Sequence, residues 1–465
     1  MPKRSVFAKW LATPDPAPAA VEAPPTVANL PMLVVGAGPA GLAGMAALAK
    51  HGVDFVGIDS HSQVGGIWDI SNPISSAYEG LRTVTSRFTT YVGMPMPNDW
   101  PSFVPHEMAL EYLAGFAESR GLLDKIKFGT SFVDARKSAA GTWMVKMRST
   151  DQGQEYEQEF RGIVFATGAH NKQQSLLPPD LSSQARAAGL DVLHSSEFKS
   201  PARFAGKRVL LVGLGDSGSD IAPKVGSAAE RTLLSVRTTP WIIPQVVRGV
   251  PVDKMGVDSP DWMPWWFRKG SFRIIRRGLI GGFRQLGLPS PKHGLHDKMT
   301  VSDRGLVAAI RSGSVVTRSH VISLTGGTAI FANPQHEPEK IDTVIFATGF
   351  GRAYPLLCHP GASNDEVADA LSFCIFHPSE PGLFYLAETV GLRSCWPIFS
   401  EQANAIVAYL LGEERATSNV RRFNARRSVA TPNFKGAIYR LADQFHLDYE
   451  IYTHCLRDLS GWLAE

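Results

Sequence analysis

Two glycine-rich turns of the same pattern, Gly-x-Gly-x-x-Gly, constrain the fold of this chain more than any other feature. They occupy residues 36–41 and 213–218, and each follows a short run of β-forming residues, 32–35 and 208–212. In a strand–turn–helix unit the first glycine permits the turn, the second lets the backbone approach a pyrophosphate, and the third allows close packing of the helix on the strand. The helix N-terminus then faces the anion. Either turn by itself also fits a simple loop between packed elements, but the repetition predicts an α/β protein with two Rossmann-like dinucleotide-binding domains.

The first turn stands in a context that favours FAD. An alanine-rich stretch with good helix propensity, 42–50, follows it. The next strand, 54–58, ends at Asp59, where an acid is expected to bind a ribose hydroxyl. The predicted FAD-binding residues here are Gly36, Ala37, Gly38, Pro39, Ala40, Gly41 and Asp59.

The second turn repeats this arrangement but is followed by the opposite charge. Its helix is expected from about Asp220, and its second strand, 231–236, leads into Arg237. An arginine at this point suits the 2′-phosphate of NADPH, whereas NAD-binding domains place an acid there. The predicted NADPH-binding residues are Gly213, Gly215, Asp216, Ser217, Gly218 and Arg237.

A second repeated motif indicates how the two domains are connected. Residues 163–168 and 344–349 both look like buried strands that end in Ala-Thr-Gly. Each dinucleotide domain would then have its own terminal strand, with the NADPH domain inserted into the FAD domain. The predicted organisation is a disordered leader at 1–30, an FAD-binding domain at 31–171 and 336–465, and an NADPH-binding domain at 172–335.

Composition describes an ordinary globular protein. The 465 residues are enough for two or three domains, and 44% of them are hydrophobic and 19% charged. A net charge of +4 is small for this size, so no nucleic-acid partner is expected. No run of about 18 apolar residues occurs, so no membrane span is predicted.

The cysteines bear on the cellular compartment. Cys358, Cys374, Cys395 and Cys455 form neither a Cys-x-x-Cys pair nor a metal-ligand spacing. A reducing compartment, a cytoplasmic location and no metal site are therefore expected. Residues 1–30 are rich in proline and alanine, which predicts a mobile leader, and their apolar run is too short for a secretory signal.

Residues 262–286 combine tryptophans with arginines and lysines, interleaved with apolar side chains. Such a segment fits contact with a membrane surface. It also fits a helical insertion that packs its apolar face on the NADPH domain and leaves its arginines solvated. We favour the second interpretation.

Several motifs occur together in a fixed order that is typical of a known family. Besides the two glycine turns, they are Gly65-Gly66-Ile67-Trp68, Phe165-Ala166-Thr167-Gly168, Ser235-Val236-Arg237 and Phe346-Ala347-Thr348-Gly349-Phe350. Over residues 32–412 the chain resembles a class B flavin-containing monooxygenase. The resemblance adds Gly65, Gly66, Trp68, Thr348 and Gly349 to the expected cofactor-binding residues.

The resemblance implies an enzyme that uses FAD, NADPH and O₂. NADPH would reduce the flavin, the reduced flavin would capture O₂ as a C4a-hydroperoxide, and a small N- or S-containing nucleophile would take one oxygen atom. The protein would supply orientation and exclude water, so no catalytic side chain is predicted. Expected partners are O₂ and a small-molecule substrate. A homodimer is one of the alternatives for the oligomeric state, and membrane contact through 262–286 is not favoured.

One departure from the family pattern falls near the expected flavin site. Val84 stands where the family commonly has an asparagine near the flavin, and Thr83 and Thr85 flank it. Loss of that amide would weaken stabilisation of an oxygenated flavin unless one of these threonines substitutes for it.

A second departure concerns the family fingerprint Phe-x-Gly-x-x-x-His-x-x-x-aromatic. His194 and Phe198 match its second half, whereas Ala188 and Leu190 replace its first Phe and Gly. Phenylalanine in the last position is typical of N- or S-oxygenating members, and Baeyer–Villiger enzymes usually have tryptophan there. His194 is expected to link domains rather than to act in bond-making.

Other functions stay open beside the favoured one. They are a Baeyer–Villiger-type ketone oxygenase, an NADPH oxidase-like flavoprotein and, less favoured, a non-catalytic redox sensor or a membrane-surface binding protein. The sequence does not identify the substrate. Tyr91, Trp241 and Trp396 are candidates for its pocket, with plain packing as the favoured role of each.

Overall fold

The computed structural model divides the chain into two compact units. Unit 1 comprises residues 1–72, 87–169 and 352–465, and unit 2 comprises residues 73–86 and 170–351. The structure describes residues 6–12, 29–88, 90–91, 93–168, 175–257, 265–295, 300–351, 355–356, 371–386, 390–391, 395–427, 438–441, 444–447 and 449–465.

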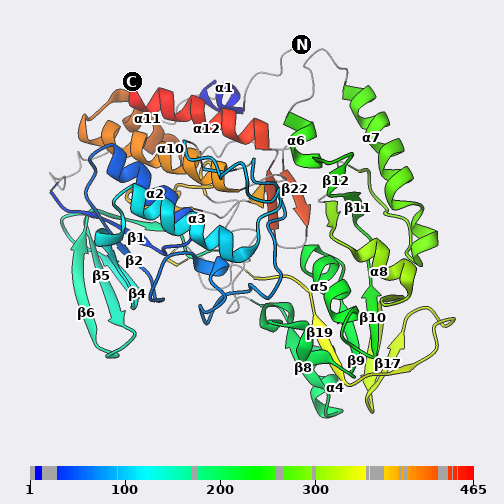
Figure 1. Ribbon diagram of the computed structural model, residues 1–465. Helices are drawn as coiled ribbons and strands as arrows, with labels where there is room; N and C mark the ends of the chain where they lie inside the picture. Colours follow the sequence, from blue (N-terminus) through cyan, green and yellow to red (C-terminus); the bar gives the residue numbers. More distant parts are fainter. Residues whose placement is uncertain are drawn as a thin grey trace. The chain divides into compact units, whose positions relative to one another are not determined.

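A five-stranded parallel sheet forms the centre of unit 1 (Figure 1). Its strand order is β20 (Leu383–Tyr385), β7 (Gly162–Phe165), β1 (Met32–Val35), β2 (Phe55–Ile58) and β3 (Ile126–Lys127). Every residue of β1 and β7 is buried, as expected for parallel strands that are covered on both faces. Strand β1 therefore lies in the middle of the sheet and delivers the first glycine turn at its carboxyl end.

Alternate side chains of β1 belong to two different cores. Met32 and Val34 pack with the helices, and Leu33 and Val35 pack with an antiparallel meander. The helices are α2 (Pro39–Lys50), α3 (His106–Ser119), α10 (Trp396–Glu414) and α12 (Tyr449–Ala464), and the meander is β4 (Thr130–Lys137), β5 (Trp143–Ser149) and β6 (Glu155–Phe160). Unit 1 is thus a three-layer α/β domain.

Unit 2 repeats this architecture. Its parallel sheet has the order β8 (Asp191–His194), β19 (Thr343–Phe346), β9 (Arg208–Val212), β10 (Arg231–Val236) and β15 (Val316–Ser319). Helices α5 (Asp216–Gly226) and α8 (Leu306–Ser312) pack on one side, and α4 (Pro179–Ala187) with the strands β16 (Val321–Thr325), β17 (Thr328–Phe331) and β18 (Glu339–Lys340) packs on the other. The predicted α/β fold with two Rossmann-like domains, one inserted into the other, is confirmed.

Unit 2 extends further toward the C-terminus than the sequence predicted. It extends to Gly351 instead of 335, because β19 pairs with both β9 and β8 of its sheet. Helix α5 also begins earlier than expected, at Asp216, directly after the glycine turn.

Unit 2 also contains residues 73–86, which the sequence analysis placed in the FAD domain. Two sets of hydrogen bonds hold this segment. The Tyr78 hydroxyl donates to Asp220 Oδ2 at 2.5 Å, and Lys199 Nζ donates to the carbonyl oxygens of Ser75 and Ala77 at 2.7 and 2.8 Å. These partners lie more than a hundred positions further along the chain, so local sequence patterns do not reveal them.

Part of the expected mobile leader is helical. Residues Val6–Leu11 form α1, and the buried side chains of Phe7 and Trp10 both contact Phe373 and Trp462. Two aromatic residues three positions apart lie on one side of a helix, so a single turn is enough to dock it. Most of the remaining leader lies outside the described residues.

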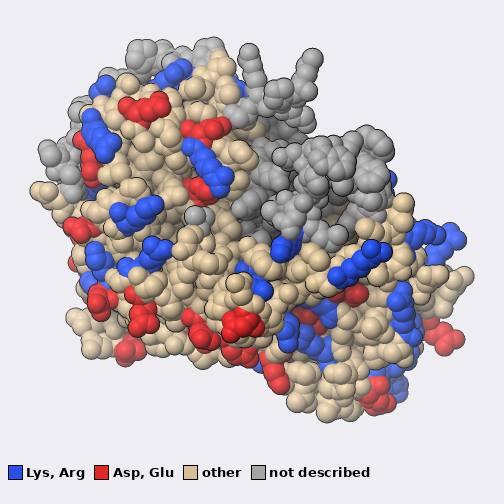
Figure 2. Space-filling view, turned by 45° about the horizontal axis from the view of Figure 1, so that its top comes forward, with Lys and Arg blue, Asp and Glu red and all other residues tan. Residues whose placement is uncertain are grey.

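The remaining elements are short or peripheral. They are α6 (Val252–Val257), α7 (Trp265–Ile280), α11 (Ser418–Arg426), β11 (Trp241–Pro244), β12 (Val246–Val247), β13 (Val250–Pro251), β14 (Thr300–Asp303), β21 (Val390–Gly391), β22 (Ile438–Leu441), β23 (Gln444–Leu447), and the 3₁₀ turns η1 (Gly66–Trp68), η2 (Leu123–Lys125), η4 (Ser195–Glu197), η5 (Pro201–Phe204) and η6 (Phe283–Leu286). Within the described ranges, no helix is long and apolar enough to cross a membrane. On the face drawn in Figure 2, basic and acidic side chains are interspersed, in keeping with the small net charge.

Candidate cofactor-binding site

The first glycine turn is closed by the backbone of a neighbouring strand. Gly36 has a φ of 108°, and a Cβ atom there would lie 2.5 Å from the carbonyl oxygen of Ala166. A Cβ atom on Gly41 would lie 1.8 Å from the carbonyl oxygen of Gly36. Both positions therefore require glycine. A Cβ atom on Gly38 would make ordinary contacts with the backbone of Gly66, 3.5 Å from its Cα and 3.9 Å from its N, so the protein itself does not exclude a side chain there.

The Gly-Gly-x-Trp motif packs against this turn. The backbone N–H of Gly65 donates to the carbonyl oxygen of Ala37 at 3.1 Å. A Cβ atom on Gly66 would lie 3.0 Å from the Cα of Gly38, and both glycines of the motif have positive φ, 124° and 57°. Two motifs that are separate in the sequence thus form one cradle, in which the backbones touch.

The Asp59 side chain, at the end of β2, accepts a hydrogen bond from the first glycine turn. Its Oδ2 accepts the backbone N–H of Ala37 at 2.6 Å, and its Oδ1 accepts that of His61 at 2.8 Å. Burial raises the pKa of the Asp59 carboxyl, although both hydrogen bonds favour the charged form. The carboxylate therefore holds the turn in shape, and binding of a ribose hydroxyl stays a prediction beside this role.

Aromatic rings support the start of α2. The Tyr91 hydroxyl donates to the carbonyl oxygen of Pro39, in the first turn of the helix. The rings of Tyr91 and Tyr112 each lie 5.4 Å from the Trp396 ring at small interplanar angles, and Trp68 adds an edge-to-face contact at 5.9 Å. Tyr91 and Trp396, named above as pocket candidates, are buried in this stack. Their contacts are those of packing residues.

Trp241, the third aromatic candidate, also packs inside its own unit. Its Nε1 donates to the carbonyl oxygen of His293 at 2.8 Å, and the guanidinium of Arg276 lies 4.9 Å from its ring. Of the tryptophan-rich segment 262–286, the side chains of residues 262–272 lie outside the described residues.

The second glycine turn is built like the first. Gly213 has a φ of 110°, and a Cβ atom there would lie 2.4 Å from the carbonyl oxygen of Ala347. A Cβ atom on Gly218 would lie 2.2 Å from the carbonyl oxygen of Gly213, whereas one on Gly215 would meet no atom within 4 Å. Ala166 and Ala347 are the alanines of the two Ala-Thr-Gly motifs. In each unit that alanine carbonyl therefore packs on the first glycine of the turn.

Charged side chains distinguish the second turn. Asp216 is the first residue of α5, and burial raises the pKa of its carboxyl while the Arg304 guanidinium opposes that rise. Arg304 Nη2 donates to the carbonyl oxygen of Asp216 at 3.1 Å, and its Nη1 lies 3.7 Å from Asp220 Oδ2. Arg304, Asp220 and Tyr78 were not among the predicted site residues, because they come together from three segments that are distant in the sequence.

Two other predicted residues lie at the edges of the second cradle. Ser217 follows Asp216 in the first turn of α5, and Arg237 directly follows β10 with an exposed side chain. Both are positioned by the same strand–turn–helix unit, because β9 and β10 are adjacent strands.

Hydrogen bonds within unit 2 hold the end of the second Ala-Thr-Gly motif. Thr348 Oγ1 donates to the carbonyl oxygen of Leu176. The buried His194 contacts the carbonyl oxygen of Gly349 through Nε2 at 3.0 Å, and its Nδ1 accepts the backbone N–H of Ser196 at 3.2 Å. Burial lowers the pKa of His194, which agrees with a neutral ring that carries its proton on Nε2. Cofactor binding by Thr348 and Gly349 stays a prediction.

Residues 83–85 belong to unit 2. Thr83 is buried, whereas the Val84 side chain is 42% exposed. The next residue, Ser86, donates from its backbone N–H and its Oγ to Asp253 Oδ2 at 2.7 and 2.8 Å. The expected location of residues 83–85 near a flavin stays a prediction.

Sequence comparisons place the chain among flavoproteins. The family model for flavin-binding monooxygenase-like proteins matches residues 31–378. Flavin-containing monooxygenase 3 of Oryctolagus cuniculus is 30% identical over 348 residues, and flavin-containing monooxygenase 5 of Rattus norvegicus is 31% identical over 342 residues. Each match covers 70% of this chain, and the chain spans 62% of the length of each relative.

Solved structures show the same fold at low identity. A steroid monooxygenase bound to NADP superposes with a TM-score of 0.66 at 16% identity, covering 94% of this chain and 98% of that one. The S-allyl-L-cysteine S-oxygenase of Allium sativum superposes with a TM-score of 0.59 at 17% identity, covering 93% and 88%.

The two cradles fit dinucleotide cofactors on their own geometry. In each, two glycines are required by backbone contacts, and the middle glycine, which no such contact requires, lies at the start of a helix. The chain therefore belongs to the flavin-binding monooxygenase-like family.

Proposed function

We propose that this chain is an NADPH- and O₂-dependent flavin monooxygenase that transfers one oxygen atom to a small N- or S-containing nucleophile. The observation that carries the proposal is the pair of cradles built to one plan, in a chain of this family. FAD reduced by NADPH supplies the oxygen-transfer chemistry when bound. The protein binds and orients the cofactors and the substrate, and it excludes water from the reacting atoms.

The first cradle would hold FAD. The open side of Gly38 allows a pyrophosphate to approach the backbone, and the N-terminus of α2 directs its free N–H groups toward that anion. Gly65 and Gly66 would form the opposite wall. Asp59 would accept a hydrogen bond from the ribose.

The second cradle would hold NADPH. Gly215 has open space where the pyrophosphate would approach, at the N-terminus of α5. Arg237 provides an exposed cation at the end of the second strand, which supports recognition of the 2′-phosphate.

The preference for an N- or S-containing substrate rests on two observations. Phe198 occupies the last fingerprint position, where Baeyer–Villiger enzymes usually have tryptophan. Two relatives at 30% and 31% identity are named flavin-containing monooxygenases, and one structural neighbour is named an S-oxygenase. A ketone oxygenase is the alternative in the same family, since other structural neighbours are a steroid and a cyclohexanone monooxygenase.

Val84 supports a second candidate function, an NADPH oxidase that releases hydrogen peroxide. Its side chain has no hydrogen-bonding group, whereas the family commonly has an asparagine at this position. Without that amide, the reduced oxygen would be released as hydrogen peroxide before an atom of it is transferred to a substrate.

Product accounting separates these functions. NADPH consumption, O₂ uptake and peroxide release would be measured for the FAD-loaded protein with a thioether, a tertiary amine and a ketone. We expect the thioether or the amine to raise O₂ uptake and to yield the S- or N-oxide in proportion to NADPH consumed. Ester formation from the ketone would favour the Baeyer–Villiger alternative. Peroxide that accounts for all NADPH consumed would refute the monooxygenase proposal.

A cytoplasmic location, a homodimer and surface contact with membranes through residues 262–286 have less support. The first rests on cysteine usage alone. Light scattering of the purified protein would test the dimer, and flotation with anionic vesicles would test membrane contact.

A further inference from the structure

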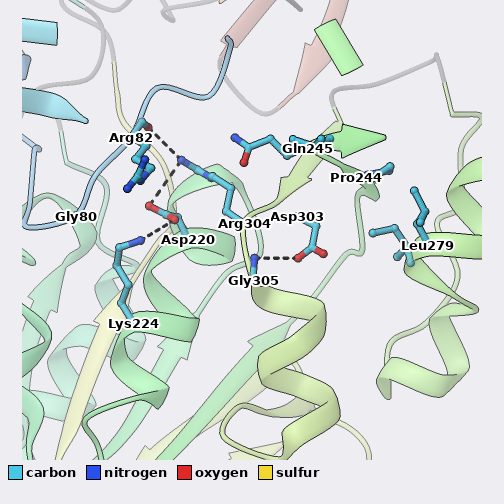
Figure 3. A pocket seen from close by; sticks show the side chains of 12 residues that line it. Gly80, Arg82, Asp220, Lys224, Pro244, Gln245, Leu279, Asp303, Arg304 and Gly305 are labelled. Atoms are coloured by element: carbon cyan, nitrogen blue, oxygen red, sulfur yellow. Dashed lines mark hydrogen bonds and ion pairs between the residues drawn. The ribbon is translucent and has the colours of Figure 1, made fainter. Parts of the chain in front are cut away.

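A pocket of about 510 Å³ lies in unit 2 beside α5 (Figure 3). Its lining includes Gly80 and Arg82 of segment 73–86, Asp220 of α5, and Arg304, which directly follows β14. Gly80 and Arg82 therefore border open space on this side instead of packed protein. Hydrogen bonds from other parts of unit 2 must hold this part of the segment in place.

The two ends of segment 73–86 are attached to residues outside the glycine turn 213–218. Near its start, Lys199 Nζ donates to the carbonyl oxygens of Ser75 and Ala77 at 2.7 and 2.8 Å. At its end, Ser86 donates from its backbone N–H and its Oγ to Asp253 Oδ2. Neither Lys199 nor Asp253 belongs to α5, so these attachments do not depend directly on the helix that would bind a nucleotide.

Tyr78 attaches the segment to α5 itself. Its side chain is buried, its hydroxyl donates to Asp220 Oδ2 at 2.5 Å, and its ring makes an edge-to-face contact with Phe198 at 5.1 Å. Asp220 also accepts from Lys224 Nζ at 2.9 Å. The first half of the segment is therefore part of the core of unit 2.

A single side chain connects the start of α5 to the middle of the segment. Arg304 Nη2 donates to the carbonyl oxygen of Asp216 at 3.1 Å, and Nη1 donates to the carbonyl oxygen of Arg82 at 3.5 Å. Nη1 also lies 3.7 Å from Asp220 Oδ2, and Figure 3 shows the guanidinium between Arg82 and Asp220. Arg82 directly precedes residues 83–85.

This arrangement has a consequence for nucleotide binding. A pyrophosphate at the N-terminus of α5 would bind the N–H groups of the first turn and so fix the backbone of Asp216. The Arg304 side chain is only 7% exposed, and a guanidinium is a rigid plane, so its two outer nitrogens move together. When Asp216 is fixed, Arg304 is held on it, and the Arg82 carbonyl is held in turn.

We propose that Arg304 is a positioning residue that couples NADPH binding at α5 to the order of residues 80–86. The inference rests on the proposed function, because it takes the second cradle as the NADPH site. Residues 83–85, which we expect near the flavin, would then be fixed in position when NADPH or NADP⁺ is bound.

Hydrogen–deuterium exchange of the FAD-loaded protein, with and without saturating NADP⁺, tests the coupling. In the unmodified protein we expect NADP⁺ to slow backbone exchange in residues 80–86 by about threefold or more, because ordering suppresses local opening. Arg304→Lys keeps a positive charge beside Asp216 and Asp220, but one ammonium group does not reproduce the two-pronged contact with both carbonyl oxygens. We expect it to abolish the slowing by NADP⁺.

The affinity for NADP⁺ provides a second measurement. Coupling between two events is reciprocal, so Arg304→Lys should weaken NADP⁺ binding by the same factor, about threefold, as measured by calorimetry. A purely structural role of Arg304 would instead raise exchange in residues 80–86 equally with and without NADP⁺.

Arg311→Lys is the matched control. Arg311 lies at the end of α8 in the same unit, and its Nη2 donates to the carbonyl oxygen of Ile280 at 3.0 Å. This substitution should leave the effect of NADP⁺ on residues 80–86 unchanged. Tyr78→Phe removes an attachment of the segment to α5 but keeps the Arg304 contacts, so it should raise exchange while NADP⁺ still slows it.

Two results would overturn this inference and leave the proposed function intact. One is NADP⁺ binding that does not slow exchange in residues 80–86 of the unmodified protein, a measurement that needs no variant to fold. The other is a slowing that Arg304→Lys retains in full. A protein that does not bind NADP⁺ at all would overturn the proposed function as well.

Discussion

The two glycine turns share a backbone but differ in their charges. In both, a Cβ atom on the first or third glycine would collide with a carbonyl oxygen, whereas one on the middle glycine would meet no atom at Gly215 and only an ordinary contact at 3.5 Å at Gly38. The first turn has the uncharged Pro39 after its middle glycine and the acid Asp59 at the end of the next strand. The second turn contains the acid Asp216 and has the cation Arg237 at the equivalent strand end. Two turns with the same backbone shape therefore have different charged groups beside them.

This comparison separates two requirements that one motif combines. The first and third glycines are needed for the fold, because backbone atoms of the protein itself occupy the space of a side chain. In our proposal, the middle glycine and Arg237 are the positions that the ligand requires. Substitutions at these two classes of position should therefore affect different measurements.

The largest effect is expected from Gly41→Ala, with Gly218→Ala as its counterpart in unit 2. The new methyl group would lie 1.8 or 2.2 Å from a carbonyl oxygen, so α2 or α5 must shift away from its strand. We expect a loss of about 3–5 kcal/mol in unfolding free energy, measured by chemical denaturation.

Gly44→Ala, also in α2, is the control. Its Cβ atom would lie 3.0 Å from Cδ1 of the buried Leu386 side chain, a contact that a shift of a few tenths of an ångström relieves, and it meets no backbone oxygen. Equal destabilisation by Gly41→Ala and Gly44→Ala would contradict the assignment of Gly41 to the fold.

Gly38→Ala should preserve the fold and prevent FAD binding. Its methyl group has an ordinary contact at 3.5 Å within the protein, but it would intrude where the pyrophosphate approaches. We expect FAD affinity to fall about a hundredfold, which corresponds to a loss of roughly 3 kcal/mol of binding free energy. Titration of the apoprotein with FAD measures the affinity, and flavin absorbance shows how much FAD the purified protein retains.

Gly215→Ala is the matched variant in the second cradle. It should leave FAD content unchanged and weaken NADPH binding instead. Normal FAD content in Gly38→Ala, or loss of FAD in Gly215→Ala, would show that the two cradles are assigned incorrectly.

Arg237→Ala should reduce the preference for NADPH over NADH. A charge-assisted contact to the 2′-phosphate contributes about 1.5–3 kcal/mol, so the preference should fall roughly ten- to a hundredfold. The ratio of kcat/KM values for the two nucleotides measures it.

Arg231→Ala removes an arginine from the other end of β10, where it pairs with Glu339, and serves as the control. An unchanged NADPH preference in Arg237→Ala would refute the role given to this residue.

The smallest effect is expected from Asp216→Asn. Burial raises the pKa of Asp216, so its carboxylate charge increases as pH rises through that raised pKa. The charged form would repel a bound phosphate. NADP⁺ affinity of the unmodified protein should therefore decrease toward higher pH, and the asparagine variant should bind more tightly there by about fivefold, as for two charges about 4 Å apart in water.

Titration of NADP⁺ binding from pH 5 to 9 would measure this difference. Asp191→Asn, which changes a partly exposed ion pair with Arg203 in the same unit, should not alter the pH profile. Parallel profiles for the Asp216 variant and the unmodified protein would show that the carboxylate does not sense the nucleotide.

Much of the fold could be predicted from local sequence. The strands before each glycine turn are continuous apolar runs, and each turn has the glycine spacing that its geometry requires. Two Ala-Thr-Gly motifs indicated the duplication, and the structure adds the reason, since each alanine carbonyl packs on the first glycine of its turn. Helix α1 was missed, because only its contacts with Phe373 and Trp462 distinguish it from a mobile leader.

The sequence by itself determined the two nucleotide cradles, because a tight turn, a close backbone approach and a following helix depend on residues that are adjacent in the chain. Only the tertiary structure decided which distant segments surround them. The attachment of residues 73–86 to unit 2 depends on bonds from Tyr78 to Asp220 and from Lys199 to Ser75. The pocket beside α5 likewise requires Gln245, Leu279 and Arg304 to meet. Contacts of this kind depend on how separate elements pack, so the local spacing of residues does not predict them.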